Sequence, residues 1–129
     1  MLCPSEETII SLNRAIIERY SAKRGDKHTL LSYSKIADVV LQVKTTEGPT
    51  HRKAAALMRG IVQAHAFASG NKRTAFFATR EFLQKNNAPF APTDGAQNVR
   101  ILIGIREGFY SLDDISNWLR TGAIHEFRR

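Results

Sequence analysis

The stretch that decides the fold is KAAALMRGIVQAHAFASGNKRTA, residues 53–75. Its first half places apolar side chains three and four residues apart, which predicts a helix with one broad apolar face. The run HAFASG then ends that pattern with a glycine, which favours tight turns. Asn71, Lys72 and Arg73 follow and open a second apolar run. The stretch therefore predicts two helices joined by a short turn that carries a histidine and two cations.

The same periodicity predicts helices along most of the chain. We expect them at residues 5–22, 34–44, 50–67, 74–86 and 94–107, with a last helix from the SLDD sequence at 111–114 to Gly122. Small alanines in the helix at 50–67 allow neighbours to approach closely, so this helix is expected at the centre. No useful length of chain alternates with period two. The sequence predicts one all-α domain, residues 1–129, of about six helices around a central helix.

Composition narrows the class of protein. The chain has 129 residues, 43% of them hydrophobic, which is enough to form a core. A single cysteine, Cys3, can form neither an internal disulfide nor a metal cage. No apolar run reaches the roughly 18 residues of a membrane span, and the first ten residues lack a signal-peptide pattern. We therefore expect a cytoplasmic protein with no membrane partner.

The net charge of +7 favours an anionic partner. The lysines and arginines are spread along the chain, which is also typical of an ordinary solvated basic surface. No zinc finger or RNA-recognition signature is present, so a nucleic-acid partner is the less favoured interpretation. Nucleotides and acidic proteins are the other anionic ligands that such a surface attracts.

The turn before the second long helix has the chemistry of an anion site. The first N–H groups of a helix have no partner within the helix and lie at the positive end of its dipole. Lys72 and Arg73 add full charges there, where cations normally destabilise a helix, so an anionic ligand is expected to offset them. Arg suits planar recognition of phosphate oxygens, and Lys acts as a mobile point charge.

His65 ends the preceding helix a few residues from this anion site. An imidazole in that place can take a proton from an incoming hydroxyl, and a base beside a phosphate site predicts phosphoryl or nucleotidyl transfer. Each piece also has an ordinary structural interpretation: a core histidine, a plain turn and two solvated cations. The residues alone leave both interpretations open.

The whole motif resembles the signature of the Fic/Doc family. The pattern HxFxxGNKRTA is carried here by His65, Phe67, Gly70, Asn71, Lys72, Arg73, Thr74 and Ala75. The approach KAAALMRGIVQAHAF and the ending YSLDDISNWLR are also similar to the corresponding helices of the family. The likeness spans most of the chain and implies an all-α fold and ATP as the nucleotide.

The resemblance assigns roles residue by residue. It implies that His65 is the general base on a target hydroxyl and that Arg73 binds nucleotide phosphate and takes part in catalysis. Gly70, Asn71 and Lys72 would build the anion site, and Ser69 would also contact the nucleotide phosphates. Phe67 would be the buried anchor of the loop, a role that its size also suits in an ordinary core.

Lys72 is the residue that separates the branches of the family. Fic proteins mostly have glycine there and transfer AMP, whereas the Doc (death-on-curing) branch has lysine and transfers the terminal phosphate. The sequence is therefore interpreted as a Doc-like toxin kinase. An AMP-transferase is the alternative within the enzymes.

Ser69 departs from the family pattern, which usually has an acid that holds Mg²⁺ at this position. Serine can ligate Mg²⁺ but brings no negative charge. Three outcomes stay open: a metal held mainly by phosphates and water, a carboxylate from elsewhere, or loss of catalysis with binding retained. The third outcome would make the chain a Fic-fold binding module.

Partners follow from the same resemblance. The expected substrate is a translation protein such as elongation factor Tu, and the expected inhibitor is a helix of a separate antitoxin lying in a groove. Two further side chains carry structural expectations. His51 is expected to be solvated or to cap the central helix, and Trp118 is expected in the core.

Overall fold

The computed structural model describes residues 2–21, 27–93 and 95–128, and within these ranges it contains six α-helices and no strand. The predicted all-α fold of about six helices is therefore confirmed. Residue 22 of the first predicted helix and residue 94 of the fifth lie outside the described residues. No helix of the described part is both long and apolar enough to cross a bilayer.

The helices follow the predicted order. They are α1 (Glu6–Ile16), which continues into a π-helical turn η1 (Ile17–Ser21), then α2 (Tyr33–Thr45), α3 (Thr50–Ala64), α4 (Asn71–Lys85), α5 (Ala96–Arg106) and α6 (Leu112–Thr121). Serines fix three of the starts, because the side chains of Ser5, Ser32 and Ser111 each accept a bond from a backbone N–H three residues on. At α6 this bond is part of a capping box, which Ser111 and Asp114 of the SLDD sequence form.

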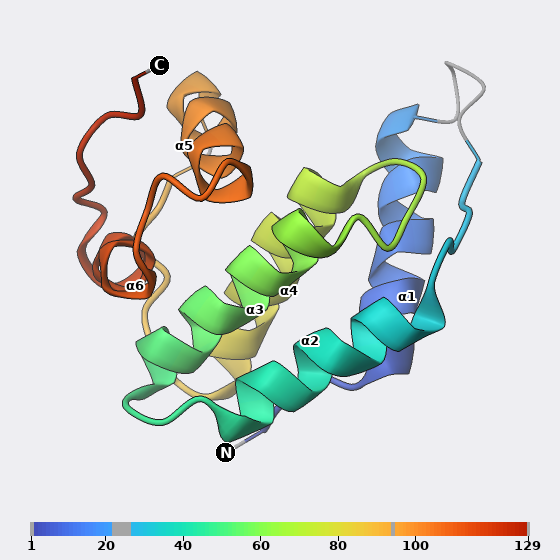
Figure 1. Ribbon diagram of the computed structural model, residues 1–129, viewed down its shortest axis with the longest axis horizontal. Coiled ribbons are helices and arrows are strands. Elements are labelled where there is room, and N and C mark those ends of the chain that lie inside the picture. The colour runs from blue at the N-terminus through green and yellow to red at the C-terminus, as the bar shows by residue number, and fades with distance from the viewer. Residues whose placement is uncertain (1, 22–26, 94, 129) are drawn as a thin grey trace.

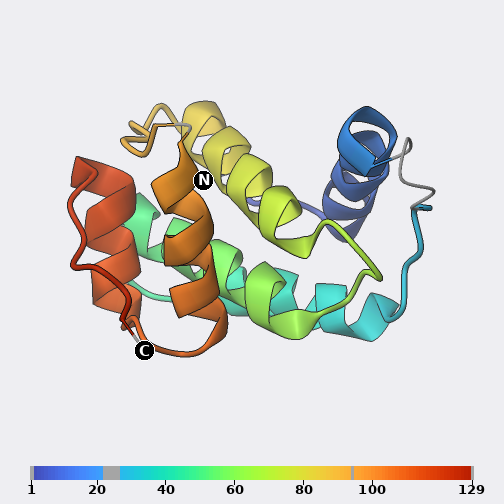
Figure 2. The same cartoon turned by 90° about the horizontal axis from the view of Figure 1, so that it is seen from above.

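Helix α3 lies at the centre of the molecule. It packs against α2, α4, α5 and α6, while α1 packs against α4 and α2. Figure 1 shows α3 between α1 on one side and the α5–α6 pair on the other. Seen from above in Figure 2, α4 lies beside α3 and α5 lies across from the turn that joins them. This arrangement brings the α3–α4 turn, the end of α1 and α5 into one neighbourhood.

Small residues let α3 occupy the centre. Ala54, Ala55 and Ala56 are buried, and a Cβ at Gly60 would meet a methyl group of Val39 on α2 at 3.0 Å. The larger apolar side chains of α3 are also buried and join one core with those of the neighbouring helices. Burial of this face stabilises the fold, because apolar area removed from water favours the folded state.

Three local features differ from the prediction. Helix α3 ends at Ala64 rather than near residue 67, because His65 is left-handed. Trp118 is in the core as expected, but His51 is buried, and its Nε2 lies 2.7 Å from the carbonyl oxygen of Pro89. The prediction of a solvated or capping His51 is therefore wrong, since the loop after α4 folds back over the start of α3. The end of the first predicted helix is the π-helical turn η1 rather than α-helix, and Tyr20 within it is exposed.

Candidate functional site

The turn between α3 and α4 leaves the helical path at His65. Its backbone is left-handed (φ 49°, ψ 43°), a conformation that histidine tolerates better than most residues. The chain then runs extended beside residues 29–32. The N–H of Leu31 donates to the carbonyl of Ala66 at 2.7 Å, and the N–H of Ala68 donates to the carbonyl of Thr29 at 3.0 Å. These hydrogen bonds hold residues 66–68 as an extended segment beside residues 29–32, and we call this segment the strap.

The side-chain amide of Asn71 is hydrogen-bonded to the backbone of Phe67 and so holds the turn together. Its Nδ2 donates to the carbonyl of Phe67 at 2.8 Å, and its Oδ1 accepts the N–H of the same residue at 3.2 Å. Phe67 itself is buried, with 2% of its surface exposed. The amide of Asn71 is thus engaged in shaping the loop, and what it offers to a ligand is its backbone N–H at the first position of α4.

Asn13 of α1 ties the turn to the rest of the protein. It is fully buried, and its Nδ2 donates to the carbonyl of Ser69 at 3.0 Å and to the hydroxyl of Thr74 at 3.1 Å. Its Oδ1 lies 2.8 Å from Nδ1 of His28, which therefore carries the proton of this bond. Burial, with repulsion from Arg14, lowers the pKa of His28 below its ordinary value, although Glu18 opposes this.

Gly70 is the N-cap residue of α4 and lies against the end of α1. Its backbone is left-handed (φ 78°), and a Cβ there would meet Ile17 Cδ1 at 3.1 Å and Asn13 Nδ2 at 3.2 Å. Glycine is needed for both reasons, the dihedral angle and the space. The first N–H groups of α4, which have no partner within the helix, therefore lie directly beside the turn.

A cleft of about 1050 Å³ opens along the start of α4, between the turn on one side and α5 on the other. All the predicted site residues except the buried Phe67 line it: His65, Ser69, Gly70, Asn71, Lys72 and Arg73. The structure thus brings these side chains together. The cleft is of the size that small-molecule ligands occupy in proteins.

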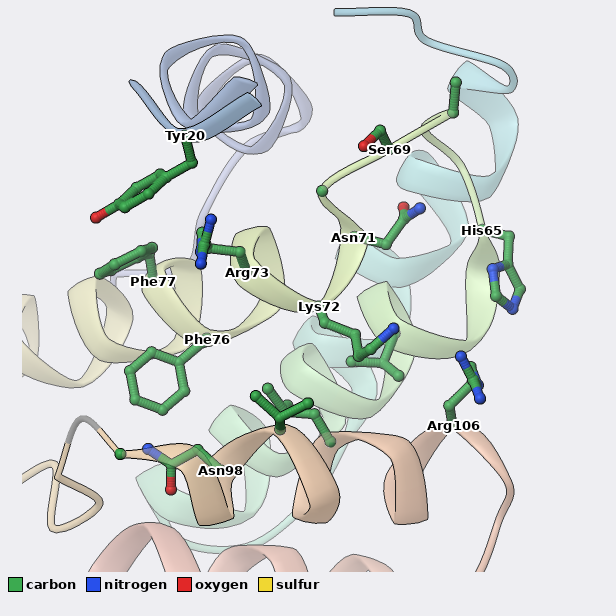
Figure 3. Close-up of a pocket in the computed structure, with 16 residues that line it drawn as sticks. Tyr20, His65, Ser69, Asn71, Lys72, Arg73, Phe76, Phe77, Asn98 and Arg106 are labelled. Atoms are coloured by element: carbon green, nitrogen blue, oxygen red, sulfur yellow. The ribbon is translucent and has the colours of Figure 1, made fainter. Parts of the chain in front are cut away.

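One end of the cleft is aromatic. Tyr20 and Phe77 stack with ring centroids 6.3 Å apart, and Phe76 meets Phe77 edge-on at 5.9 Å. The guanidinium of Arg73 lies over the ring of Tyr20, 3.9 Å from its centroid. Figure 3 shows Arg73 pointing toward this end, away from Lys72 and His65. We call Tyr20, Phe76 and Phe77 the aromatic end.

The other end of the cleft is cationic. Figure 3 shows Lys72, from the first turn of α4, and Arg106, from the last turn of α5, directed toward the region of His65. His65 is exposed, and its ring makes no hydrogen bond to another described residue. Arg106 is paired with its chain neighbour Glu107 at 3.4 Å. We call His65, Lys72 and Arg106 the cationic end.

The cations of α4 stand where the helix dipole disfavours them. The first turn of α4 contains Lys72 and Arg73 and no acidic residue. None of the ion pairs among the described residues involves either side chain. An anion bound at the start of α4 would relieve this repulsion, which is the chemical reason to regard the cleft as a phosphate site.

The donor set of the cleft does not fit a protein-bound Mg²⁺ ion. Mg²⁺ in nucleotide sites is normally held through one or two carboxylates as well as phosphates. The described residues that line the cleft include no Asp or Glu, and Ser69 stands where the family resemblance places the acid. In the described part of the chain, no group of three acidic, His or Cys residues is placed to hold a metal.

Three residues of the site were not found from the sequence. Asn13 looks like a polar residue of an amphipathic helix, Tyr20 continues the apolar spacing of the same helix, and Arg106 belongs to no motif. A polar residue within an apolar face is a weak signal that could have drawn attention to Asn13. Nothing in the sequence pattern marks Tyr20 or Arg106, because their place depends on η1 and on how α5 packs.

Comparison with known proteins agrees with the motif. The model of the Fic/DOC family matches residues 3–83, which run from the segment before α1 into α4 and contain the whole turn. The match includes Asn13 and Tyr20 and stops before α5, so Arg106 lies outside it. No curated protein matches the chain.

Proposed function

The chain belongs to the Fic/DOC family, and from that premise we propose that it transfers the γ-phosphate of ATP to a Ser or Thr hydroxyl of another protein. Members of the family are typically enzymes that transfer nucleotide or phosphate groups. The family match does not separate its branches. The choice of the γ-phosphate therefore rests on which end of the cleft is aromatic and which end is cationic.

The two ends of the cleft suit the two ends of a nucleotide. Aromatic rings and guanidinium planes stack on bases, and the aromatic end offers Phe76, Phe77 and the guanidinium of Arg73 on Tyr20. The N–H groups of α4 and Lys72 suit phosphates, and they lie between the aromatic end and His65 (Figure 3). A nucleotide laid in this direction carries its terminal phosphate to His65. This single observation favours transfer of the γ-phosphate over transfer of AMP.

The chemistry that follows needs one base and one anion site. His65 accepts the proton of the target hydroxyl, whose oxygen forms a bond to the γ-phosphorus. The bond from that phosphorus to the bridging oxygen breaks, and ADP leaves. The exposed position of His65 allows a hydroxyl of another protein to reach it. The N–H groups of α4 and the ammonium of Lys72 stabilise the charge on the phosphates.

The protein substrate and the inhibitor are proposed on the resemblance to the Doc branch, which Lys72 carries. The substrate is a translation protein such as elongation factor Tu, and the inhibitor is a helix of a separate antitoxin. A second function, nucleotide or partner binding without transfer, is favoured by Ser69, which leaves the cleft short of the negative charge that a metal needs.

ATP labelled at the α- or at the γ-phosphate tests the proposal. Each is incubated with the purified protein, a lysate of its own organism and purified elongation factor Tu, and His65→Asn serves as the control. Asparagine tolerates the left-handed backbone of residue 65, so this variant removes the base and keeps the turn.

The labelled bands decide between the three functions. A His65-dependent band with the γ-label supports the kinase, and its mass identifies the substrate. A His65-dependent band with the α-label alone means AMP transfer and shows that the assigned direction of the nucleotide is wrong. No transfer by a protein that binds ATP would establish the binding function.

A further inference from the structure

The charge of the cleft has an unusual balance for an ATP site. The described residues that line it include Lys72, Arg73 and Arg106 and no acidic residue. The triphosphate of ATP needs its charge neutralised before a nucleophile can approach it, and most sites use Mg²⁺ held near a carboxylate. Here the protein itself supplies cations from two separate helices.

Arg106 stands opposite Lys72 across the cleft. Lys72 comes from the start of α4 and Arg106 from the end of α5, and Figure 3 shows both directed toward the region of His65. The side chain of Gln63 on α3 donates to the carbonyl of Ile105 at 3.0 Å and so fixes the end of α5 next to Arg106. The two cations therefore face one another from helices held on α3.

Neither cation of this pair is engaged elsewhere in a strong interaction. Lys72 is in no ion pair of the described residues, and Arg106 pairs with Glu107 at 3.4 Å, with about a third of the Arg106 side chain exposed. An exposed pair between chain neighbours contributes little and is readily exchanged. Arg73 differs, because its guanidinium lies on Tyr20 at the aromatic end.

We propose that Lys72 and Arg106 hold the terminal phosphates of ATP from opposite walls of the cleft and replace Mg²⁺ as the source of positive charge. This inference rests on the proposed function, because it assumes that ATP is the ligand. It assigns phosphate binding to Arg106, which the family match does not cover. It also explains Ser69, since a carboxylate there would repel the phosphates when no metal bridges them.

The pair acts on the leaving group as well as on binding. When the target oxygen bonds to the γ-phosphorus and the bridging bond breaks, negative charge grows on the β-phosphate of ADP. Two fixed cations near that charge stabilise the transition state more than the bound substrate. The proton goes to His65, and no further reactant is needed.

Isothermal titration with ATP, ADP and AMP, in EDTA and again in excess Mg²⁺, tests the inference without any measurement of transfer. The wild type is compared with Arg106→Gln, Arg106→Lys and Ser69→Asp. Arg120→Gln is the matched control, because it removes the same charge from an exposed site on α6. Circular dichroism spectra check that every variant is folded.

The wild type is expected to bind ATP with a Kd that changes less than about threefold between EDTA and Mg²⁺. Arg106→Gln is expected to weaken ATP binding in EDTA by about tenfold or more, since it removes a charge-assisted bond. The loss should be smaller for AMP, which lacks the terminal phosphates, and absent in Arg120→Gln. Arg106→Lys should restore part of the affinity.

Ser69→Asp gives the converse test. The added carboxylate is expected to weaken ATP binding in EDTA and to make that binding Mg²⁺-dependent, by about tenfold. A wild-type protein that binds ATP only with Mg²⁺, or an Arg106→Gln variant that binds as well as Arg120→Gln, overturns the inference and leaves the proposed function standing. A wild type that binds no ATP in either buffer overturns both.

Discussion

The two walls of the cleft are built in different ways. The turn wall, residues 65–73, is held mainly by polar contacts: the bonds of Asn13 and Asn71 and the strap beside residues 29–32. The α5 wall is held mainly by apolar packing of Ile101, Leu102 and Ile105 on the core. Helix α5 also begins at Gly95 without a side-chain cap.

This difference in how the two walls are held indicates which part of the function each wall serves. Directional hydrogen bonds set the positions of groups closely, whereas apolar packing is less directional and accepts more varied side chains. We therefore expect the turn wall to place the base and the anion site, and the α5 wall to add Arg106 to nucleotide binding and to the leaving group. Changes to the base or to the hydrogen bonds of the turn wall should abolish transfer or unfold the turn, and changes on α5 should alter ATP binding and lower transfer to a smaller extent.

The largest expected effect is that of His65→Asn. Transfer should fall by about 100-fold or more, because the base is lost, while the Kd for ATP should change less than about threefold. Rates of label transfer and titration of ATP measure the two quantities. A variant that keeps its rate would show that the turn wall does not supply the base.

Two buried asparagines, Asn13 bonded to the turn wall and Asn98 on the α5 wall, compare the walls directly. Asn13→Ala removes the partner of Ser69, Thr74 and His28, whereas Asn98→Ala removes one bond to the carbonyl of Thr93. The free energy of unfolding should fall by roughly 3 kcal/mol for Asn13→Ala and roughly 1 kcal/mol for Asn98→Ala.

Urea denaturation measures both losses on the same protein. Equal losses, or a larger loss for Asn98→Ala, would mean that the turn wall is not the more strongly bonded of the two. Asn13→Ala should also reduce transfer, because the carbonyl of Ser69 is no longer held.

Two glycines with nearly equal φ angles isolate the effect of the close contacts behind the turn. A Cβ at Gly70 (φ 78°) would closely approach Ile17 and Asn13, while a Cβ at Gly108 (φ 77°) would have nothing within 4 Å. Gly108→Ala should cost about 1 kcal/mol for the left-handed backbone alone. Gly70→Ala should cost roughly 1 kcal/mol more, since neighbours must also move. Thermal unfolding of both variants gives the comparison, and equal costs would argue against crowding.

The smallest expected effect concerns His28, whose ring is hydrogen-bonded to the side chain of Asn13. Its pKa is lowered in the folded state, so the unfolded chain binds the proton more readily. The contribution of neutral His28 to stability is therefore complete above the ordinary imidazole pKa of about 6.5 and is lost as pH falls through the lower folded pKa.

Urea denaturation at pH 7.5 and 5.5 measures this contribution. The wild type should lose more stability on acidification than His28→Gln, which can still donate a bond to Asn13 but does not titrate in this range. Identical pH dependence of the two proteins would remove His28 from the support of the turn.

The helices and the turn could be predicted because their causes are local. The capping sequence SLDD, the glycine at residue 70 and the spacing of apolar side chains all act within a few residues of themselves. The end of α3 was placed too late, since the left-handed His65 depends on the strap beside residues 29–32. His51 was misplaced for a similar reason, because its partner is the distant Pro89.

The sequence by itself determined that this chain forms an all-α domain and that a histidine, a tight turn and two cations meet at the start of a helix. These features are encoded in contiguous residues, where dihedral preferences and apolar spacing decide the outcome. Only the tertiary structure decided which groups complete the cleft and which group holds its turn. Asn13, Tyr20 and Arg106 come from α1, η1 and α5, and their meeting depends on how helices pack on α3, which no local pattern records.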